Sequence, residues 1–264
     1  MTKPDSGAVY LGVDLGSTAI KIVGVNGAGD ILFNDLIRTN PQNILNINSI
    51  DYRKYSDNPV KSICATGYGR KNLFEANCAS PEIICQARGI IHLYEGVGTI
   101  IDVGGQDTKV IEVAKSKVVN FYMNDKCAAG TGRFIEKVAD ILGLSLKEMS
   151  TMKIEDNDVV PITSVCAVFA ETEIISLIAK NTNISRIINS LYYSLANRLA
   201  NNVRAFGLKD KVVFTGGLGV HERFIYWLQE VLKCKIIVPA SPQFSAALGA
   251  ALIGKELKQN EDGL

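Results

Sequence analysis

The sequence predicts a mixed α/β fold built from two similar halves, and three observations support this prediction. Short apolar segments that end in glycine-containing turns alternate with longer stretches whose apolar residues recur at helical spacing. The segment DLGSTAIKI, which begins at Asp14, matches DVGGQDTKV, which begins at Asp102. Hydrophobic residues make up 47% of the 264 residues and charged residues 21%, which is the composition of a globular chain rather than a disordered one.

The first half opens with strands. Three are expected, joined by glycine-containing turns: residues 9–16, residues 20–25 and a third that begins at Ile31 after a hairpin turn at residues 27–30. A further strand is expected over residues 61–66, where the chain runs into Gly67-Tyr68-Gly69-Arg70. Residues 40–60 carry few periodic signals, so their role stays open.

The second half repeats this order. Its strands are expected at residues 98–105, 108–113 and 117–123. Both matching segments read Asp, aliphatic, Gly, four residues, Lys, aliphatic, and the hairpins that follow them also correspond. Coincidence between two glycine-rich turns would not extend to the hairpins, so an internal duplication is the better explanation.

The rest of the chain is more helical. Helices are expected at residues 133–142, 167–180, 184–206, 222–232 and 245–257, and strands at residues 211–215 and 235–238. The expected domains are a disordered stretch at 1–8, a first domain over 9–97 completed by the C-terminal helix at about 245–258, and a second domain over 98–244.

Composition excludes several classes of function. The net charge is +1, so no basic excess favours nucleic acid, and no apolar run is long enough to span a membrane. The N-terminus lacks an apolar signal core, which predicts a cytoplasmic protein. The six cysteines are expected to be reduced, and none of them forms a CxxC pair. With only His92 and His221, the chain cannot build a multi-histidine metal site by itself.

Three glycine-containing turns that each follow a strand are the candidate nucleotide site: Asp14–Thr18, Asp102–Gln106 and Thr215–Gly217. Glycine lets backbone amides approach an anion, so two facing turns can clamp a triphosphate. An Asp at the strand end can hold Mg²⁺ through its waters. Lys21 either reaches a phosphate or forms a structural salt bridge. The chain has no GxxxxGK[ST] motif and no GxGxxG after its first strand, which argues against Walker-type and dinucleotide-binding sites.

Two cysteines stand just before predicted helices. The helix dipole stabilises a thiolate at Cys127 and at Cys166, although both also fit as ordinary buried cysteines. Two thiolates are too few for a [4Fe–4S] cluster, which takes four. A twofold dimer would supply the four.

The three turns resemble those of the actin, hexokinase and Hsp70 superfamily of ATPases. The resemblance implies two ribonuclease-H-like domains with an ATP-binding cleft between them. Residues 14–21 would be the first phosphate loop, residues 102–109 the second, and residues 214–219 the adenosine loop. Residues 249–251 would lie in the second connecting helix.

A more specific resemblance rests on MNDKCAAGTGRF and SVCAVFAETEIIS, and it covers nearly all of residues 9–254. These strings resemble the activators of 2-hydroxyacyl-CoA dehydratases, a family that includes the ATPase subunits of benzoyl-CoA reductases. The resemblance implies an oxygen-sensitive homodimeric ATPase with one [4Fe–4S] cluster, held by Cys127 and Cys166 of both subunits. A reduced ferredoxin or flavodoxin would supply the electron, and an iron–sulfur dehydratase or reductase would accept it. Gln86 stands where the family often has His.

The resemblance also implies a set of residues that bind ATP or ADP: Asp14, Gly16, Ser17, Thr18, Lys21, Asp102, Gly104, Gly105, Gln106, Gly132, Gly216, Gly217 and Gln243. Asp14 and Asp102 are expected to hold Mg²⁺ through water. Asp102 or Gln106 is expected to orient the attacking water.

Two other classes of protein stay open at this point. A sugar or acetate kinase of the same superfamily would need a substrate pocket with a catalytic Asp. A non-enzymatic nucleotide sensor or scaffold would not need thiols at helix starts. For an activator, the acceptor could be a dehydratase for one of several 2-hydroxyacyl-CoAs, a benzoyl-CoA-type reductase or a double-cubane cluster protein, and the sequence does not choose among them.

Overall fold

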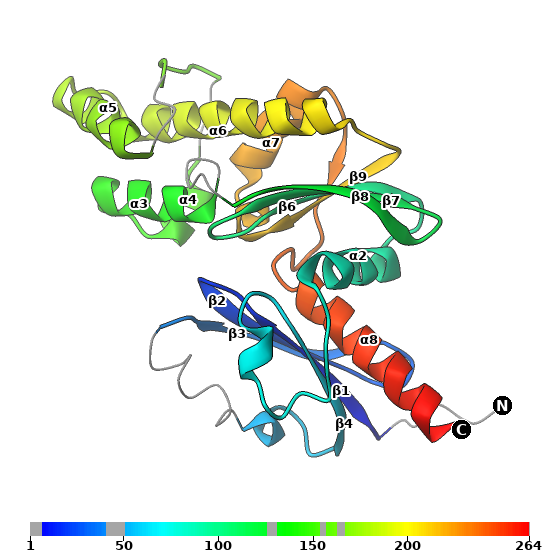
Figure 1. The fold of residues 1–264 in the computed structure, drawn as a ribbon. Coiled ribbons are helices and arrows are strands. Elements are labelled where there is room, and N and C mark those ends of the chain that lie inside the picture. Colours follow the sequence, from blue (N-terminus) through cyan, green and yellow to red (C-terminus); the bar gives the residue numbers. More distant parts are fainter. Residues whose placement is uncertain (1–6, 41–50, 126–130, 154–156, 163–166, 264) are drawn as a thin grey trace. The chain divides into compact units, whose positions relative to one another are not determined.

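The computed structural model describes residues 7–40, 51–125, 131–153, 157–162 and 167–263 (Figure 1). The strands are β1 (Val9–Leu15), β2 (Ala19–Val25), β3 (Ile31–Arg38), β4 (Val60–Thr66), β5 (Cys78–Ala79), β6 (Val97–Val103), β7 (Thr108–Ala114), β8 (Lys117–Asn124), β9 (Lys211–Gly216) and β10 (Ile236–Ile237). The α-helices are α2 (Glu82–Leu93), α3 (Gly132–Leu142), α4 (Leu146–Thr151), α5 (Ala167–Ala179), α6 (Ile184–Phe206), α7 (Glu222–Leu232) and α8 (Ser245–Asp262). Short 3₁₀ helices are η2 (Tyr52–Tyr55), η3 (Arg70–Asn72) and η5 (Gly217–Val220).

Two five-stranded sheets share one strand order. The first runs β3-β2-β1-β4-β5 and the second runs β8-β7-β6-β9-β10, so each strand of one sheet has a counterpart in the other. In the first sheet β1 is antiparallel to β2 and parallel to β4. In the second sheet β6 is antiparallel to β7, and β9 is parallel to β10. The duplication seen in the sequence is therefore a duplication of the sheet.

The register of each hairpin explains the spacing within the repeat. Asp14 lies directly opposite Lys21 in the β1–β2 pair, and Asp102 lies directly opposite Lys109 in the β6–β7 pair. Residues opposite each other on antiparallel strands point to the same face of the sheet, so each Lys meets the Asp seven positions before it.

The chain divides into two compact units. Unit 1 comprises Met1–Val97, Val113–Val119 and Gln243–Leu264, and unit 2 comprises Gly98–Glu112 and Asn120–Pro242. The first half of the repeat lies in unit 1, and the Asp–Lys pair of the second half lies in unit 2.

In unit 1, α8 packs against β1 and α2 through direct backbone contact. A Cβ on Gly12 would lie 1.8 Å from the carbonyl oxygen of Ala247 in α8. A Cβ on Gly249 in α8 would lie 1.7 Å from the carbonyl oxygen of Cys85 in α2. Only glycine fits at these two positions, so Gly12 and Gly249 are both required by the packing of α8.

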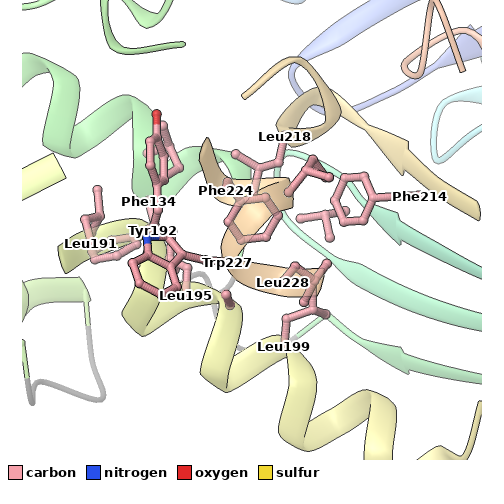
Figure 2. Close-up of a cluster of buried hydrophobic side chains, with 14 of the residues drawn as sticks. Phe134, Leu191, Tyr192, Leu195, Leu199, Phe214, Leu218, Phe224, Trp227 and Leu228 are labelled. Carbon is pink, nitrogen blue, oxygen red and sulfur yellow. The ribbon is translucent and has the colours of Figure 1, made fainter. Parts of the chain in front are cut away.

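Unit 2 has a larger core beneath α6 and α7. Figure 2 shows its aromatic centre, where Tyr192 of α6 and Phe224 of α7 meet edge to face at 6.3 Å between ring centroids. Phe214 of β9 meets the same Phe224 ring at 5.8 Å. This core fixes the end of β9, which carries one of the predicted glycine turns.

Helix boundaries agree with the sequence where caps are present. Helix α6 begins after Asn183, whose side chain accepts a hydrogen bond from the Ser185 amide, and it ends at Gly207. Helix α8 extends past the predicted end to Asp262. Helices α2 and α4 are additions to the prediction. No helix in the described part of the chain is long and apolar enough to cross a bilayer.

Candidate nucleotide site

The first candidate phosphate loop follows β1. Asp14 is buried near the end of this strand, and its Oδ2 accepts a 3.0 Å hydrogen bond from Nζ of Lys21. Beyond Asp14 the turn is hydrogen-bonded to Thr39, whose Oγ1 donates to the carbonyl oxygen of Gly16 at 3.0 Å. The Thr39 amide donates to the carbonyl oxygen of Thr18. These bonds occupy carbonyl oxygens of the turn and leave Ser17 and Thr18 partly exposed.

The other oxygen of Asp14 is a buried acceptor. Its Oδ1 has no hydrogen-bond partner among the described residues. Gly67 lies beside it with φ +83°, and a Cβ there would come within 2.5 Å of this oxygen. Glycine at position 67 therefore keeps a space next to Asp14 Oδ1. A buried carboxylate oxygen without a donor is costly, and a hydrated cation would satisfy it.

A cavity of about 250 Å³ adjoins this loop. Its lining is Leu15, Gly16, Ser17, Ile20, Thr39, Tyr68, Gly69 and Asn72. Gly69 is tied to the loop through its amide, which donates to the Leu15 carbonyl oxygen. Tyr68 and Gly69 thus form part of the wall of this cavity.

The second candidate phosphate loop follows β6, and its carboxylate is held at both oxygens. Asp102 Oδ1 accepts from Thr215 Oγ1 at 2.8 Å, and Asp102 Oδ2 lies 3.4 Å from Nζ of Lys109. Lys109 is 2% exposed and also pairs with Asp107 at 2.8 Å. Two carboxylates share one ammonium here, so these three buried groups together carry a net negative charge.

The same loop is bonded to the start of α3. The amide of Gly132 donates to the carbonyl oxygen of Gly104 at 2.9 Å, and the amide of Arg133 donates to the carbonyl oxygen of Gly105 at 3.0 Å. The amide of Gly132, a predicted nucleotide ligand, is therefore engaged by the loop. Gln106, at the tip of the turn, is exposed.

The third turn follows β9. Gly216 has φ +93°, and a Cβ there would lie 2.1 Å from the Val103 carbonyl oxygen. Around Gly217 the space is open, because a Cβ added there would have no described atom within 4 Å. The turn continues into η5, and the Gly216 amide donates to the carbonyl oxygen of Pro242, just before Gln243.

The predicted residues fall into three groups. Asp14, Gly16, Ser17, Thr18, Lys21 and Gln243 belong to unit 1. Asp102, Gly104, Gly105, Gln106, Gly132, Gly216 and Gly217 belong to unit 2. Cys127 and Cys166 lie outside the described residues, which themselves contain no group of three or more His, Cys, Asp or Glu arranged to hold a metal ion.

Sequence reasoning missed three contributors to these loops. Asp107 stands inside the matched segment, where the first repeat has Ala19. Thr215 is only a strand-end residue in the sequence, and its bond to Asp102 spans 113 positions. The sequence shows Gly67 as part of a glycine-rich string but not its contact with Asp14. A second cavity, of about 410 Å³ between residues 159–162 and α6, contains none of the predicted site residues.

Two copies of this sheet, each with a buried Asp that pairs with a Lys beside a glycine turn, define an ATPase fold of the actin/hexokinase/Hsp70 type, which confirms the predicted fold class. The profile of the BadF/BadG/BcrA/BcrD ATPase family matches residues 11–254. The chain therefore belongs to this ATPase family, as its sequence resemblance indicated.

Named relatives extend over nearly the whole chain. The activator of lactoyl-CoA dehydratase from Anaerotignum propionicum is 37% identical over 257 residues, which cover 95% of this chain and 99% of the relative. A benzoyl-CoA reductase component from Thauera aromatica is 28% identical over 263 residues, which cover 93% of each chain.

Two solved structures are similar over a comparable span. The activator of 2-hydroxyisocaproyl-CoA dehydratase from Clostridium difficile, with bound ADPNP, superimposes with a TM-score of 0.90 at 33% identity and covers 97% of both chains. Component A of (R)-2-hydroxyglutaryl-CoA dehydratase from Acidaminococcus fermentans has a TM-score of 0.88 at 34% identity, with 96% of this chain and 99% of that chain covered.

Proposed function

We propose that this chain is an ATP-dependent one-electron donor that activates an iron–sulfur dehydratase of 2-hydroxyacyl-CoA substrates. Membership of the ATPase family and the names of its relatives support the ATPase and the activator role. Two hydrogen bonds, from the amides of Gly132 and Arg133 to the second loop, are the observation that supports a coupling between ATP hydrolysis and electron transfer.

The first loop supplies the metal side of the site in this proposal. Mg²⁺, when bound with ATP, neutralises phosphate charge. The Oδ1 atom of Asp14 fits this role, because it is a buried acceptor that a metal-bound water can satisfy. Lys21 holds the other oxygen of Asp14, so it fixes the carboxylate rather than contacting phosphate.

The second loop supplies a fixed carboxylate. Thr215 and Lys109 engage the two oxygens of Asp102, so its orientation is set before nucleotide arrives. Such preorganisation suits a group that orients the attacking water or a metal-bound water. Asp102 is the proposed group for this role, and Gln106 is the exposed alternative at the tip of the turn.

Helices α3 and α5 are the proposed connection to the redox centre. Cys127 stands five residues before the first residue of α3, and Cys166 directly precedes α5. Lys137 of α3 pairs with Glu171 of α5 at 2.5 Å. In this proposal, a change at the Gly104–Gly105 turn reaches α3 through two backbone hydrogen bonds. It then reaches α5 through the ion pair between the two helices.

The proposed redox centre is a [4Fe–4S] cluster shared by a homodimer, with Cys127 and Cys166 of each protomer as ligands. Such a cluster supplies one-electron transfer when bound. The electron would come from a reduced ferredoxin or flavodoxin. The acceptor is a 2-hydroxyacyl-CoA dehydratase; a benzoyl-CoA-type reductase or a double-cubane cluster protein is the alternative, and the benzoyl-CoA reductase relative from Thauera aromatica supports keeping it.

A kinase of the same superfamily is the candidate from another class. A phosphoryl acceptor next to the first loop would need a carboxylate or imidazole to take its proton. The residues that line the cavity there carry neither group. The described lining of this cavity therefore offers a sugar or an acid no group to take its proton.

Iron content tests the proposal most directly. Protein purified without oxygen should be brown and contain about four iron atoms per dimer. Cys127→Ser and Cys166→Ser should each be colourless and should fail to reduce an acceptor, while Cys234→Ser should keep its iron. Full iron in Cys166→Ser would overturn the bridging arrangement. If the parent chain hydrolyses ATP but contains no iron, it is an ATPase that does not transfer electrons, and the proposal is wrong.

A further inference from the structure

Three cysteines that the proposed function does not use lie together in unit 1. Cys64 is in β4, Cys78 is in the edge strand β5, and Cys85 is in α2. They share one apolar cluster with Ala250 and Ile253 of α8. Cys64 and Cys85 are fully buried, and Cys78 is partly exposed. Of the three residues, only Cys78 therefore has surface exposed to solvent.

Cys64 and Cys78 are direct neighbours across two strands. They are register partners in the parallel β4–β5 pair, so their side chains leave the sheet on the same face. Neighbouring strands lie about 4.8 Å apart, which falls inside the Cα separation of about 4.4–6.8 Å found in disulfides. The two side chains lie close enough for the thiols of Cys64 and Cys78 to interact directly and to shift each other's pKa.

The surroundings give the two thiols different reactivity. The interaction with the Cys64 thiol lowers the pKa of Cys78, although burial and the carboxylate of Glu261 in α8 oppose this. The same interaction and burial raise the pKa of Cys64. Burial also raises the pKa of Cys85, so that sulfur stays a protonated thiol. The partly exposed Cys78 is therefore the more nucleophilic member of the pair.

The alternatives for this cluster are weaker. The described residues include no set of three His, Cys, Asp or Glu placed to hold a metal ion, so the three thiols are not a metal site. Simple core packing accounts for Cys64 and Cys85, which are enclosed. It does not account for a second cysteine placed opposite Cys64 on a two-residue edge strand that stays partly open.

We propose that Cys64 and Cys78 form a thiol–disulfide modification site that reacts with low-molecular-weight disulfides. Cys78 attacks one sulfur of the small disulfide, forms a mixed disulfide and expels the other half as a thiolate. Cys64 then loses its proton and attacks Sγ of Cys78, which expels the second half. The two cysteines lose two electrons and two protons in total, and the small disulfide gains them as two thiols.

The experiment maps the bond in the native protein. Anaerobic holoprotein is incubated with oxidised glutathione, quenched with N-ethylmaleimide, and digested with trypsin and Glu-C together. This digestion places the three cysteines on separate peptides: residues 62–70, 76–82 and 83–88. We expect peptides 62–70 and 76–82 to be joined in most chains, and dithiothreitol to separate them.

Matched variants and alternative outcomes decide the proposal. Cys78→Ser should leave Cys64 as a free thiol, and Cys85→Ser and Cys234→Ser should form the bond as the parent does. A stable glutathione adduct on Cys78 with Cys64 free would overturn the proposal, as would a main product that joins Cys85. So would a bond that forms only in denatured protein. If a variant does not fold, mapping in the parent chain decides the question by itself.

Discussion

Thr215 Oγ1 donates a 2.8 Å hydrogen bond to Oδ1 of Asp102, a residue 113 positions earlier in the chain. The two residues stand on β9 and β6, which are neighbours in the second sheet, and both are buried. With Lys109 at the other oxygen, the carboxylate of Asp102 is held from two sides. The hydroxyl of Thr215 is thus a positioning group for the second loop.

Replacing Thr215 tests this positioning. Thr215→Val keeps the shape of the side chain and removes the donor, so kcat for ATP hydrolysis should fall about tenfold, the loss expected when a hydrogen bond to a charged group disappears. Thr215→Ser should retain most of the activity. Steady-state hydrolysis at saturating Mg-ATP measures both. If Thr215→Val has the kcat of the parent, the hydrogen bond that orients Asp102 does not contribute to ATP hydrolysis.

Gly67 next to Asp14 gives a prediction with an internal control. Gly67→Ala places a Cβ 2.5 Å from Asp14 Oδ1 at φ +83°, whereas Gly96→Ala has φ +68° and no described atom within 4 Å. An alanine with a left-handed backbone lowers the free energy of unfolding of each variant by about 1 kcal/mol. In Gly67→Ala, overpacking lowers it by about 1–3 kcal/mol more.

The measurements are denaturant unfolding and calorimetric titration with Mg-ADP. We expect Gly96→Ala to bind as the parent does and Gly67→Ala to bind more weakly, because its methyl group displaces Asp14. Equal affinity in the two variants would mean that Asp14 Oδ1 does not contribute to the site.

Gly132→Pro tests the connection from the second loop to α3. Proline is well tolerated at the first position of a helix, and Thr131 before it is extended, with φ −124° and ψ 170°. The substitution removes the amide that donates to Gly104. Gly132→Ala keeps this amide, and its Cβ would meet Gly104 at an ordinary 3.4 Å.

The readout is the rate at which an external chelator strips iron from protein purified without oxygen, which the proposed function expects to carry a cluster. In the parent chain we expect faster release with a non-hydrolysable ATP analogue than with ADP, because the proposed function requires the cluster to become accessible to the acceptor. Gly132→Ala should keep this difference and Gly132→Pro should lose it. Equal rates in the parent, with nucleotide bound in both samples, would show that α3 does not couple the two sites.

His221 predicts a loss of stability in acid. Burial lowers the pKa of His221 to about 4 from its ordinary 6.5, and the hydroxyl of Tyr192 lies 2.7 Å from its Nδ1. The unfolded chain therefore takes up a proton near pH 6.5 that the folded chain takes up only near pH 4. Stability is unaffected by this group above that window, and it falls by about 3 kcal/mol as pH drops through it.

The fluorescence of Trp227, the only tryptophan, reports the unfolding of unit 2. His221→Gln should be less stable than the parent at pH 7 and should show a shallower decline between pH 6.5 and 4. An unchanged slope would assign the acid sensitivity to other groups.

Repeated and capped features are the ones that can be predicted from this sequence. The Asp–Lys spacing at residues 14–21 and 102–109 is visible because it recurs, and the register explains it. The bounds of α6 are predictable because Asn183 and Gly207 are strong end signals. Helix α4 escapes prediction although Ser145 and Glu148 form a capping box, because its six residues are too few to show periodicity.

Contacts between distant positions are beyond the reach of sequence patterns. Nothing local marks Thr215 as the partner of Asp102, or Cys78 as the neighbour of Cys64, since strand order decides both. The edge strand β5 has only two residues, which no alternation pattern can reveal. The role of Asp107 depends on the buried position of Lys109, which the repeat does not show.

The backbone contacts of α8 have a mechanical consequence. Gly12 on β1 touches the main chain of Ala247, and Gly249 touches the main chain of Cys85. Side chains absorb small shifts by changing rotamer, but main-chain atoms in direct contact have no such freedom. A shift of α8 against β1 would therefore press on the backbone of β1 directly, at a point two residues before Asp14.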